Sequence, residues 1–180
     1  MWEDHVLMEV AKLERRYHDS TQGFITPKDA IWQWPALDPF EVLCRNDFAP
    51  YNIIFRGNQP AGIIDFDMAS PGPRLWDLAY TAYRFVPLTA PENPDTPISA
   101  ATEQLRRLNV FCAAYGMDVQ APSVLNYTVK RLNDLIDSIV TQAAAGDPAQ
   151  QRVLERGDVG IYKADRAYIQ ENLIQAVIGR

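Results

Sequence analysis

Three polar residues interrupt a short, mostly apolar stretch of the chain at spacings that suit phosphoryl transfer. Asp47 and Asn52 stand five residues apart, and Asp65 follows after two short apolar runs. A carboxylate can orient an attacking hydroxyl group and accept its proton, while carboxylate and amide oxygens are hard ligands of the kind that Mg²⁺ prefers. Phosphoryl transfer requires mainly such positioning and charge neutralisation from a protein. The set therefore predicts a magnesium-dependent phosphoryl-transfer site.

The segments that must position these residues predict a small β-hairpin. Residues 52–55 and 62–66 are β-prone runs, and residues 56–60 between them contain the turn-forming pair Gly-Asn. Residues 42–44 form another brief apolar run just before Asp47. We expect residues 52–55 to pair with residues 62–65 as an antiparallel hairpin, with polar residues at its two ends.

The rest of the chain predicts helices, because apolar residues recur at steps of three and four. Asp4 and Ser99 are expected as helix caps, and Gly116 as a helix stop. The expected helices run from Val6 to Tyr17, from Thr26 to about Trp34, and over residues 75–82, 105–115, 125–143, 149–156 and 162–178. The sum is a mainly α (α+β) fold, in which residues 1–180 form a single helical domain with a β-hairpin inset.

Composition excludes several classes of protein. The net charge of -6 argues against nucleic-acid binding, which needs a basic face. The start of the chain lacks the basic and apolar segments of a signal peptide, and no apolar run is long enough to span a membrane. The two cysteines, Cys44 and Cys112, are expected to be buried free thiols. We therefore expect a cytoplasmic protein without a membrane or nucleic-acid partner.

Residues 43–55, which include Arg45-Asn46-Asp47 and Asn52, resemble the catalytic loop of aminoglycoside phosphotransferases and choline kinases. Residues 63–67 are similar to the metal-binding motif of that family, and residues 71–79 to the segment that follows it. The later helices resemble the family's C-terminal lobe. The resemblance covers nearly the whole chain and implies a protein-kinase-like C-terminal lobe, with the hairpin carrying the catalytic and metal loops.

The resemblance also implies roles for individual residues. Asp47 would be the catalytic base, and Asn52 and Asp65 would bind Mg²⁺, with ATP as the co-substrate. Asp67 would lie near the metal or at the surface, and Asp77 would accept hydrogen bonds from the catalytic loop.

The acceptor implied by the family is a small molecule with a hydroxyl group, such as a cationic amine or an aminoglycoside. Four acidic residues of the C-terminal helices either line a pocket for such an amine or lie on solvated helix faces: Asp134, Asp137, Asp158 and Asp165. The two histidines, His5 and His18, are expected to be surface or packing residues.

Two departures from the family pattern affect the expected activity. Arg45 stands where the family usually has a His that supports the loop, so it either takes over that support or pairs with Asp65 or Asp67 and competes with the metal. No glycine-rich strand turn precedes Asp47, and Lys12 and Lys28 lie in segments expected to be helical. The N-terminal nucleotide-binding lobe is therefore expected to be absent, with little activity in the isolated chain.

Two further classes of function stay open at this point. A degenerate, non-catalytic kinase lobe that acts as a binding module would explain both departures. A metal-dependent hydrolase built on Asp47, Asp65 and Asp67 is less favoured, because the sequence lacks the histidines that such sites commonly use.

Overall fold

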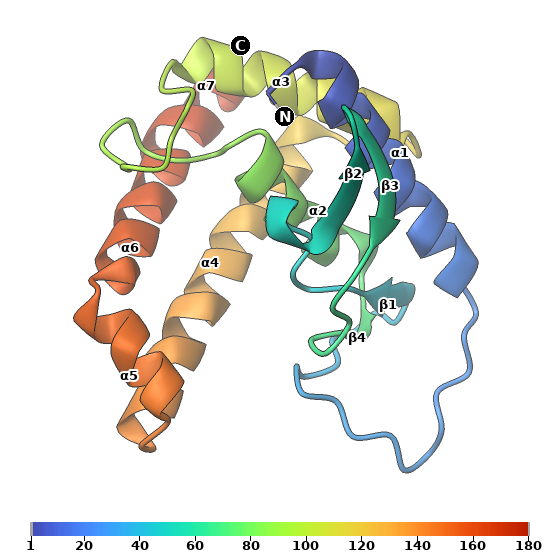
Figure 1. The fold of residues 1–180 in the computed structure, drawn as a ribbon. Coiled ribbons are helices and arrows are strands. Elements are labelled where there is room, and N and C mark those ends of the chain that lie inside the picture. Colours follow the sequence, from blue (N-terminus) through green and yellow to red (C-terminus); the bar gives the residue numbers. More distant parts are fainter. Residues whose placement is uncertain (1, 180) are drawn as a thin grey trace.

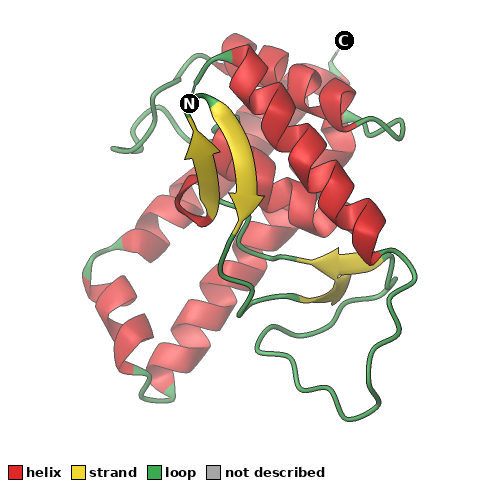
Figure 2. Ribbon diagram, turned by 45° about the vertical axis from the view of Figure 1, so that its right-hand side comes forward, coloured by secondary structure: helices red, strands yellow, loops and turns green. Residues whose placement is uncertain are grey.

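The computed structural model describes residues 2–179 and confirms the mainly α fold with small antiparallel β elements (Figures 1 and 2). The helices are α1 (Asp4–Thr21), α2 (Arg74–Phe85), α3 (Ala101–Tyr115), α4 (Ala121–Ala144), α5 (Pro148–Glu155), α6 (Asp158–Tyr168) and α7 (Gln175–Ile178). A 3-10 turn, η1 (Pro50–Asn52), precedes the hairpin, and a π-helical turn, η2 (Ile169–Ile174), joins α6 to α7. The strands are β1 (Val42–Cys44), β2 (Ile53–Arg56), β3 (Gln59–Ile63) and β4 (Ser70–Gly72).

The helices pack in pairs around one main core. α1 packs on α3, and α2 packs on α4, which also contacts α5 and α6. In Figure 1 the long helix α4 and the α5–α6 pair form one side of the molecule, while α1 and the strands form the other. The core includes Leu7, Phe48, Phe85, Leu108 and Leu125, all essentially without solvent exposure. Phe48 lies in the loop between β1 and η1, next to Asp47, so this loop packs against the core.

The predicted hairpin is present. β2 pairs with β3 in antiparallel register, with Ile53 opposite Ile63 and a bulge between Ile54 and Phe55. Gly57 begins the turn with a φ of 61°, a left-handed value that glycine adopts without strain. A second sheet pairs β1 with β4. The pattern of Ser70–Gly72 did not predict a strand, because it contains a proline and no β-branched residue.

One predicted helix is absent: the segment from Thr26 to Trp34 contains turns and extended chain within the long connection between α1 and β1 (Figure 2). Within the segment only Trp34 is buried, and Ile31 is 96% exposed, so a single side chain and not a helix face packs against the rest of the protein. Short helices are marginal without such packing. The expected caps at Asp4 and Ser99 were also wrong, since the N-cap positions are Glu3 and Ala100.

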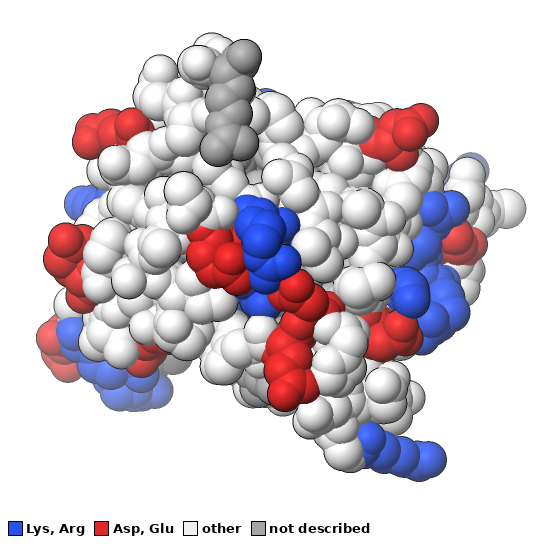
Figure 3. All heavy atoms as spheres, turned by 90° about the horizontal axis from the view of Figure 1, so that it is seen from above, with Lys and Arg blue, Asp and Glu red and all other residues white. Residues whose placement is uncertain are grey.

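Gly116 ends α3 with a φ of 81°, as expected. Cys44 and Cys112 are buried free thiols. Among residues 2–179, no helix combines the length and apolar character that crossing a bilayer would require. Figure 3 shows a largely uncharged face on which basic and acidic groups adjoin one another. Such neighbours include Arg106, whose guanidinium contacts Asp4 at 2.6 Å.

Candidate active site

Asp47 lies in the loop between β1 and η1, with its side chain 27% exposed. Its Oδ1 accepts a hydrogen bond from the Tyr51 hydroxyl at 2.8 Å, and its Oδ2 accepts one from Asn52 Nδ2 at 2.7 Å. Phe48 and Ala49, the next residues, are completely buried. The buried neighbours fix the loop backbone, and the two donors fix the carboxylate at the surface.

Asp77, fully buried on α2, anchors this loop from below. Its Oδ2 accepts from the backbone N–H of Arg45 at 2.6 Å, and its Oδ1 accepts from the N–H of Asn46 at 2.8 Å. These are the hydrogen bonds to loop backbone groups expected from the sequence. Both N–H groups would otherwise be buried without partners, which costs free energy.

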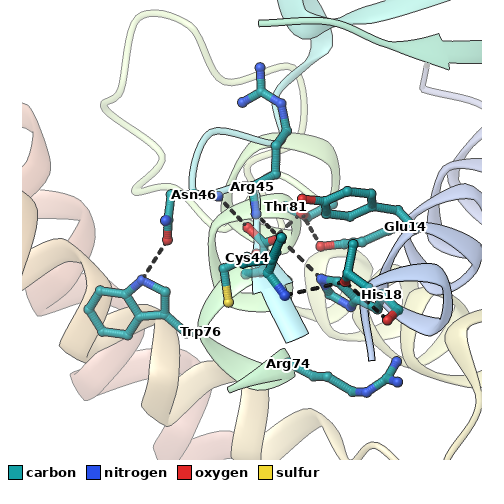
Figure 4. A network of polar contacts seen from close by, with 12 residues as sticks. Glu14, His18, Cys44, Arg45, Asn46, Arg74, Trp76 and Thr81 are labelled. Atoms are coloured by element: carbon teal, nitrogen blue, oxygen red, sulfur yellow. Dashed lines mark hydrogen bonds and ion pairs between the residues drawn. The ribbon is translucent and has the colours of Figure 1, made fainter. Parts of the chain in front are cut away.

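His18 belongs to the same network, and the expectation of an ordinary surface or packing role missed this. It is completely buried, with Nε2 3.1 Å from Asp77 Oδ2 and Nδ1 2.8 Å from the Tyr115 hydroxyl (Figure 4). A signal existed in the sequence: Glu14 and His18 continue, at steps of four, the apolar stripe of Val6 and Val10. Polar residues on a buried helix face need polar partners, and here these partners, Asp77 and Thr81, lie on α2.

Glu14 is the second group that sequence reasoning missed. Its Oε1 accepts a hydrogen bond from the Thr81 hydroxyl at 2.8 Å, while its Oε2 is buried without a partner among the described residues. Burial, and secondarily the negative charge of Asp77, raise the pKa of Glu14 well above its ordinary value. The carboxyl group is therefore uncharged over a wider pH range than an exposed glutamate.

Asn46 ties the catalytic loop to the chain that follows the hairpin. Its Nδ2 donates to the carbonyl of Met68 at 2.8 Å and to the Ser70 hydroxyl at 2.9 Å, and its Oδ1 accepts from Trp76 Nε1 at 3.0 Å. Its backbone carbonyl accepts from Arg131 Nη2 at 2.9 Å. Every polar group of this residue therefore has a buried partner, which explains how it maintains a φ of 65°.

Arg45 joins the two loops. Its side chain is fully buried and points away from the buried carboxylates (Figure 4). It donates from Nε to the Ile64 carbonyl at 3.2 Å and from Nη1 to the Asp47 carbonyl. Among residues 2–179 it forms no ion pair with Asp65 or Asp67. Its Nη1 lies 4.0 Å from Asp47 Oδ2, so Arg45 joins the segment of Asp47 to that of Ile64 through these contacts.

Asp65 follows directly on the hairpin. The N–H of Ile64 donates to the carbonyl of Asn52 at 3.1 Å, which continues the β2–β3 pairing and brings Asp65 next to Asn52. Asp65 has a φ of 61°, a left-handed conformation that side-chain-bearing residues adopt infrequently. Both Asp65 and Asp67 are exposed. Sequence and fold thus bring Asn52 and Asp65 together, with Asp67 two residues farther along.

The donor atoms of Asn52 and Asp65 fit Mg²⁺. Asn52 is 5% exposed, and because its Nδ2 donates to Asp47, its Oδ1 is left as an acceptor. The Asp65 carboxylate makes no hydrogen bond or ion pair within residues 2–179. An amide oxygen and a carboxylate are hard ligands, and Mg²⁺ is commonly held in proteins by one or two carboxylates together with substrate phosphates and water.

A cavity of about 480 Å³ adjoins Tyr51, whose hydroxyl donates to Asp47; Asp47 itself does not line the cavity. Residues of α2, of the loop after α2 and of α6 form most of its wall, together with Trp2 and Pro50. Asp158 also lines it. Asp165 does not line this cavity; it is completely buried and accepts from the Tyr83 hydroxyl at 2.6 Å, so it does not lie on a solvated helix face.

Comparisons with known proteins agree with this geometry. The trifolitoxin immunity protein of Rhizobium leguminosarum bv. trifolii is 23% identical over 155 residues, which cover 83% of this chain and 55% of that protein. The chain thus spans about half the length of this curated relative. No solved structure matches the chain significantly. Residues 3–115, which include Asp47, Asn52 and Asp65, match the phosphotransferase enzyme family. The chain therefore belongs to the phosphotransferase enzyme family.

Proposed function

We propose that the protein takes part in ATP-dependent phosphoryl transfer to a hydroxyl group of a small molecule. The observation that carries the proposal is the partly exposed Asp47 carboxylate, which is held by Tyr51 and Asn52, with Tyr51 also lining a cavity. An acceptor in that cavity can present its hydroxyl to Asp47, which then orients it and takes its proton. General base catalysis of this kind contributes about 10²–10⁴-fold to a rate.

Asn52 and Asp65 would hold Mg²⁺, with Asp67 close to it. When bound, the ion neutralises negative charge on the phosphates of the nucleotide. Asn52 would then have two tasks, because its Nδ2 holds the Asp47 carboxylate and its Oδ1 would be available to the metal. This shared residue fixes the base relative to the transferred phosphate, and positioning supplies much of the catalysis in such reactions.

We propose that residues 1–180 form a single lobe that supplies the base, the metal ligands and the acceptor cavity. None of the strands within residues 2–179 carries a lysine, and Lys12 lies on α1 in a contact of 2.8 Å with Glu9. The nucleotide phosphates would be held by a second lobe, present in the same polypeptide or supplied by another. The buried thiols of Cys44 and Cys112 are compatible with a cytoplasmic location.

The proposal is tested by a coupled ATP-consumption assay across amino alcohols, aminoglycosides and hydroxy acids. Asp47→Asn should abolish turnover, while the matched control Asp137→Asn, at an exposed position of α4, should leave it unchanged. Asp65→Ala should weaken Mg-ATP binding, measured by thermal shift. Turnover that survives in Asp47→Asn would disprove the assigned base. If the 180-residue chain is inactive, the assay is repeated after a nucleotide-binding lobe has been added.

A second candidate function is a non-catalytic lobe that binds a partner. The observation in its favour is the similarity to a protein named for immunity, which suggests protection against a toxin by binding or by modification. The two candidates are separated by Mg-ATP. A concentration-dependent rise in melting temperature that is lost in Asp65→Ala supports the phosphotransferase. A protective effect that persists in Asp47→Asn supports the binding module.

A further inference from the structure

Four tyrosines line the cavity that adjoins Tyr51. Tyr51 and Tyr80 lie nearest to the base, and their hydroxyl oxygens are 3.5 Å apart. Tyr83 and Tyr162 continue the wall, with ring centroids 6.5 Å apart. Tyrosine rings offer apolar contact area, and the few charged side chains between them determine which ligands bind.

One of those charged groups is Arg84, in the last turn of α2. Its guanidinium lies 5.8 Å from the centroid of the Tyr51 ring and 5.9 Å from that of Tyr83. Within residues 2–179 it forms no ion pair and donates no hydrogen bond, and its Nε is shielded from solvent without a partner. A buried donor of this kind costs free energy until an acceptor reaches it.

Arg131 and Arg166 also have a buried donor without a partner, but three arginines buried more deeply than Arg84 each donate at least one hydrogen bond to a backbone carbonyl. Arg45 donates to the carbonyl of Ile64, Arg107 donates to those of Phe85 and Val86, and Arg131 donates to that of Asn46. Each of them therefore uses its guanidinium to hold backbone. Arg84 donates to no backbone carbonyl within residues 2–179 and lines the cavity, so its donors are not committed to holding the fold.

The acidic residues of the cavity do not neutralise Arg84. Asp158 is paired with Arg156, its Oδ2 lying 2.5 Å from Arg156 Nη2. Asp95 lines the cavity from the exposed loop after α2 and forms no ion pair within residues 2–179. The cavity thus has an unmatched positive charge on its wall and an unmatched negative charge at an exposed position.

We propose that Arg84 binds an anionic group of the acceptor, a carboxylate or a phosphate, while the acceptor hydroxyl faces Asp47. This inference rests on the proposed function, because it concerns the acceptor of the same site. The planar guanidinium can donate to both oxygens of such an anion, and the tyrosine rings keep it in place. An amine on the same molecule would find Asp95 at the exposed side, whereas an amine at Arg84 would be repelled.

The test measures acceptor binding without nucleotide or metal, by ligand-observed NMR. The probes are hydroxycarboxylates, hydroxyalkyl phosphates, the neutral carboxamides of the same hydroxy acids, and amino alcohols of equal length. The carboxylate or the phosphate should bind about 10–100-fold more tightly than the carboxamide, as expected for hydrogen bonds to a charged group. The stronger of the two anionic probes identifies the group.

Three variants make the result specific. Arg84→Gln should remove the preference for the anionic probe, and Arg84→Lys should retain part of it, because lysine keeps the charge but loses the planar fork. Arg16→Gln, which removes an exposed arginine of α1, is the matched control and should change nothing. Circular dichroism and urea unfolding establish that each variant is folded.

Several outcomes would overturn the proposal. One is tight binding of amino alcohols that Arg84→Gln does not weaken, and another is failure of every anionic probe to bind at millimolar concentration. A third is an equal fall in kcat for charged and uncharged acceptors in Arg84→Gln, which would place Arg84 at the transferred phosphoryl group. The binding test needs neither ATP nor Asp47. If the phosphotransferase assay fails while binding that depends on Arg84 is still observed, the result contradicts the proposed function and leaves this inference standing.

Discussion

The loop that carries Asp47 and the loop that carries Asp65 are built in opposite ways. The base loop is anchored from inside the protein, by Asp77 to its backbone and by Phe48 in the core. The loop that carries Asp65 is exposed at Asp65 and Asp67, and the Asp65 carboxylate makes no hydrogen bond or ion pair within residues 2–179. The loop of Asp47 is therefore held by the core and by α2, whereas the loop of Asp65 is held by a few contacts with the loop of Asp47.

The difference matches the chemistry proposed for each loop. A general base must be placed within hydrogen-bond reach of one proton, so a rigid support is useful. A metal ligand shares its ion with phosphates and water, which can adjust. Arg45 joins the two, because it donates to the carbonyls of both Asp47 and Ile64.

The largest effect is expected from removing the anchor of the base loop. Asp77→Ala leaves the buried N–H groups of Arg45 and Asn46 without partners and should lower the free energy of unfolding by about 3–5 kcal/mol. Urea unfolding followed by tryptophan fluorescence measures this. Asp137→Ala, on an exposed face of α4, is the control and should leave the midpoint unchanged. Equal midpoints for the two variants would show that the base loop does not depend on its anchor.

A smaller effect is expected from cutting the link between the loops. Arg45→Met removes the hydrogen bonds to the carbonyls of Asp47 and Ile64 and should cost about 2–3 kcal/mol, because the hydrogen bonds of a buried charged donor are lost. Amide hydrogen exchange should accelerate more at the exit of the hairpin than in α2. The exposed Arg56 on the same hairpin supplies the control Arg56→Met. If exchange rises equally in both segments, Arg45 is a general packing residue and not a link.

The buried network under the base loop should make stability depend on pH. The pKa of Glu14 is raised on folding, so between about pH 4.5 and that raised value the folded state holds a proton that the unfolded state has released. Stability should therefore fall as pH rises through this window, by up to about 1.4 kcal/mol per pH unit from this group.

Glu14→Gln keeps an acceptor for Thr81 and should flatten that slope. Urea unfolding at several pH values between 5 and 8 compares the variant with the wild type, and the difference in slope isolates Glu14 from other titrating groups. A variant as pH-dependent as the wild type would show that Glu14 is ionised in the folded protein.

The smallest effect is expected in the exposed loop. Asp65→Gly removes the strain of a left-handed backbone at a residue with a side chain, but glycine also has a larger conformational entropy in the unfolded state. The net effect should be a free energy of unfolding higher by about 0.5 kcal/mol. Asp67→Gly gains no such relief and should be slightly destabilising. Thermal unfolding compares the two. A clear loss in Asp65→Gly would mean that its carboxylate supports the fold, contrary to its exposed position.

Much of this architecture could be predicted from local patterns. The hairpin followed from β-prone runs around a Gly-Asn turn, and α2, α3 and α4 from apolar periodicity. The order of Asp47, Asn52 and Asp65 indicated the family, to which the match over residues 3–115 also points. The segment from Thr26 to Trp34 shows where such patterns fail. Its Thr-Pro start is typical of a helix, but the segment has no apolar helix face that packs against the core.

The sequence by itself determined the chemistry that the loops can offer, since residue types and their spacing along one segment are local properties. Only the tertiary structure decided how those residues are supported. Glu14 and His18 reach Asp77 from another helix, 59 or more residues away, and Arg84 meets the cavity through α2. Such contacts depend on how helices pack around a common core, and burial then decides which groups keep a proton or lack a partner.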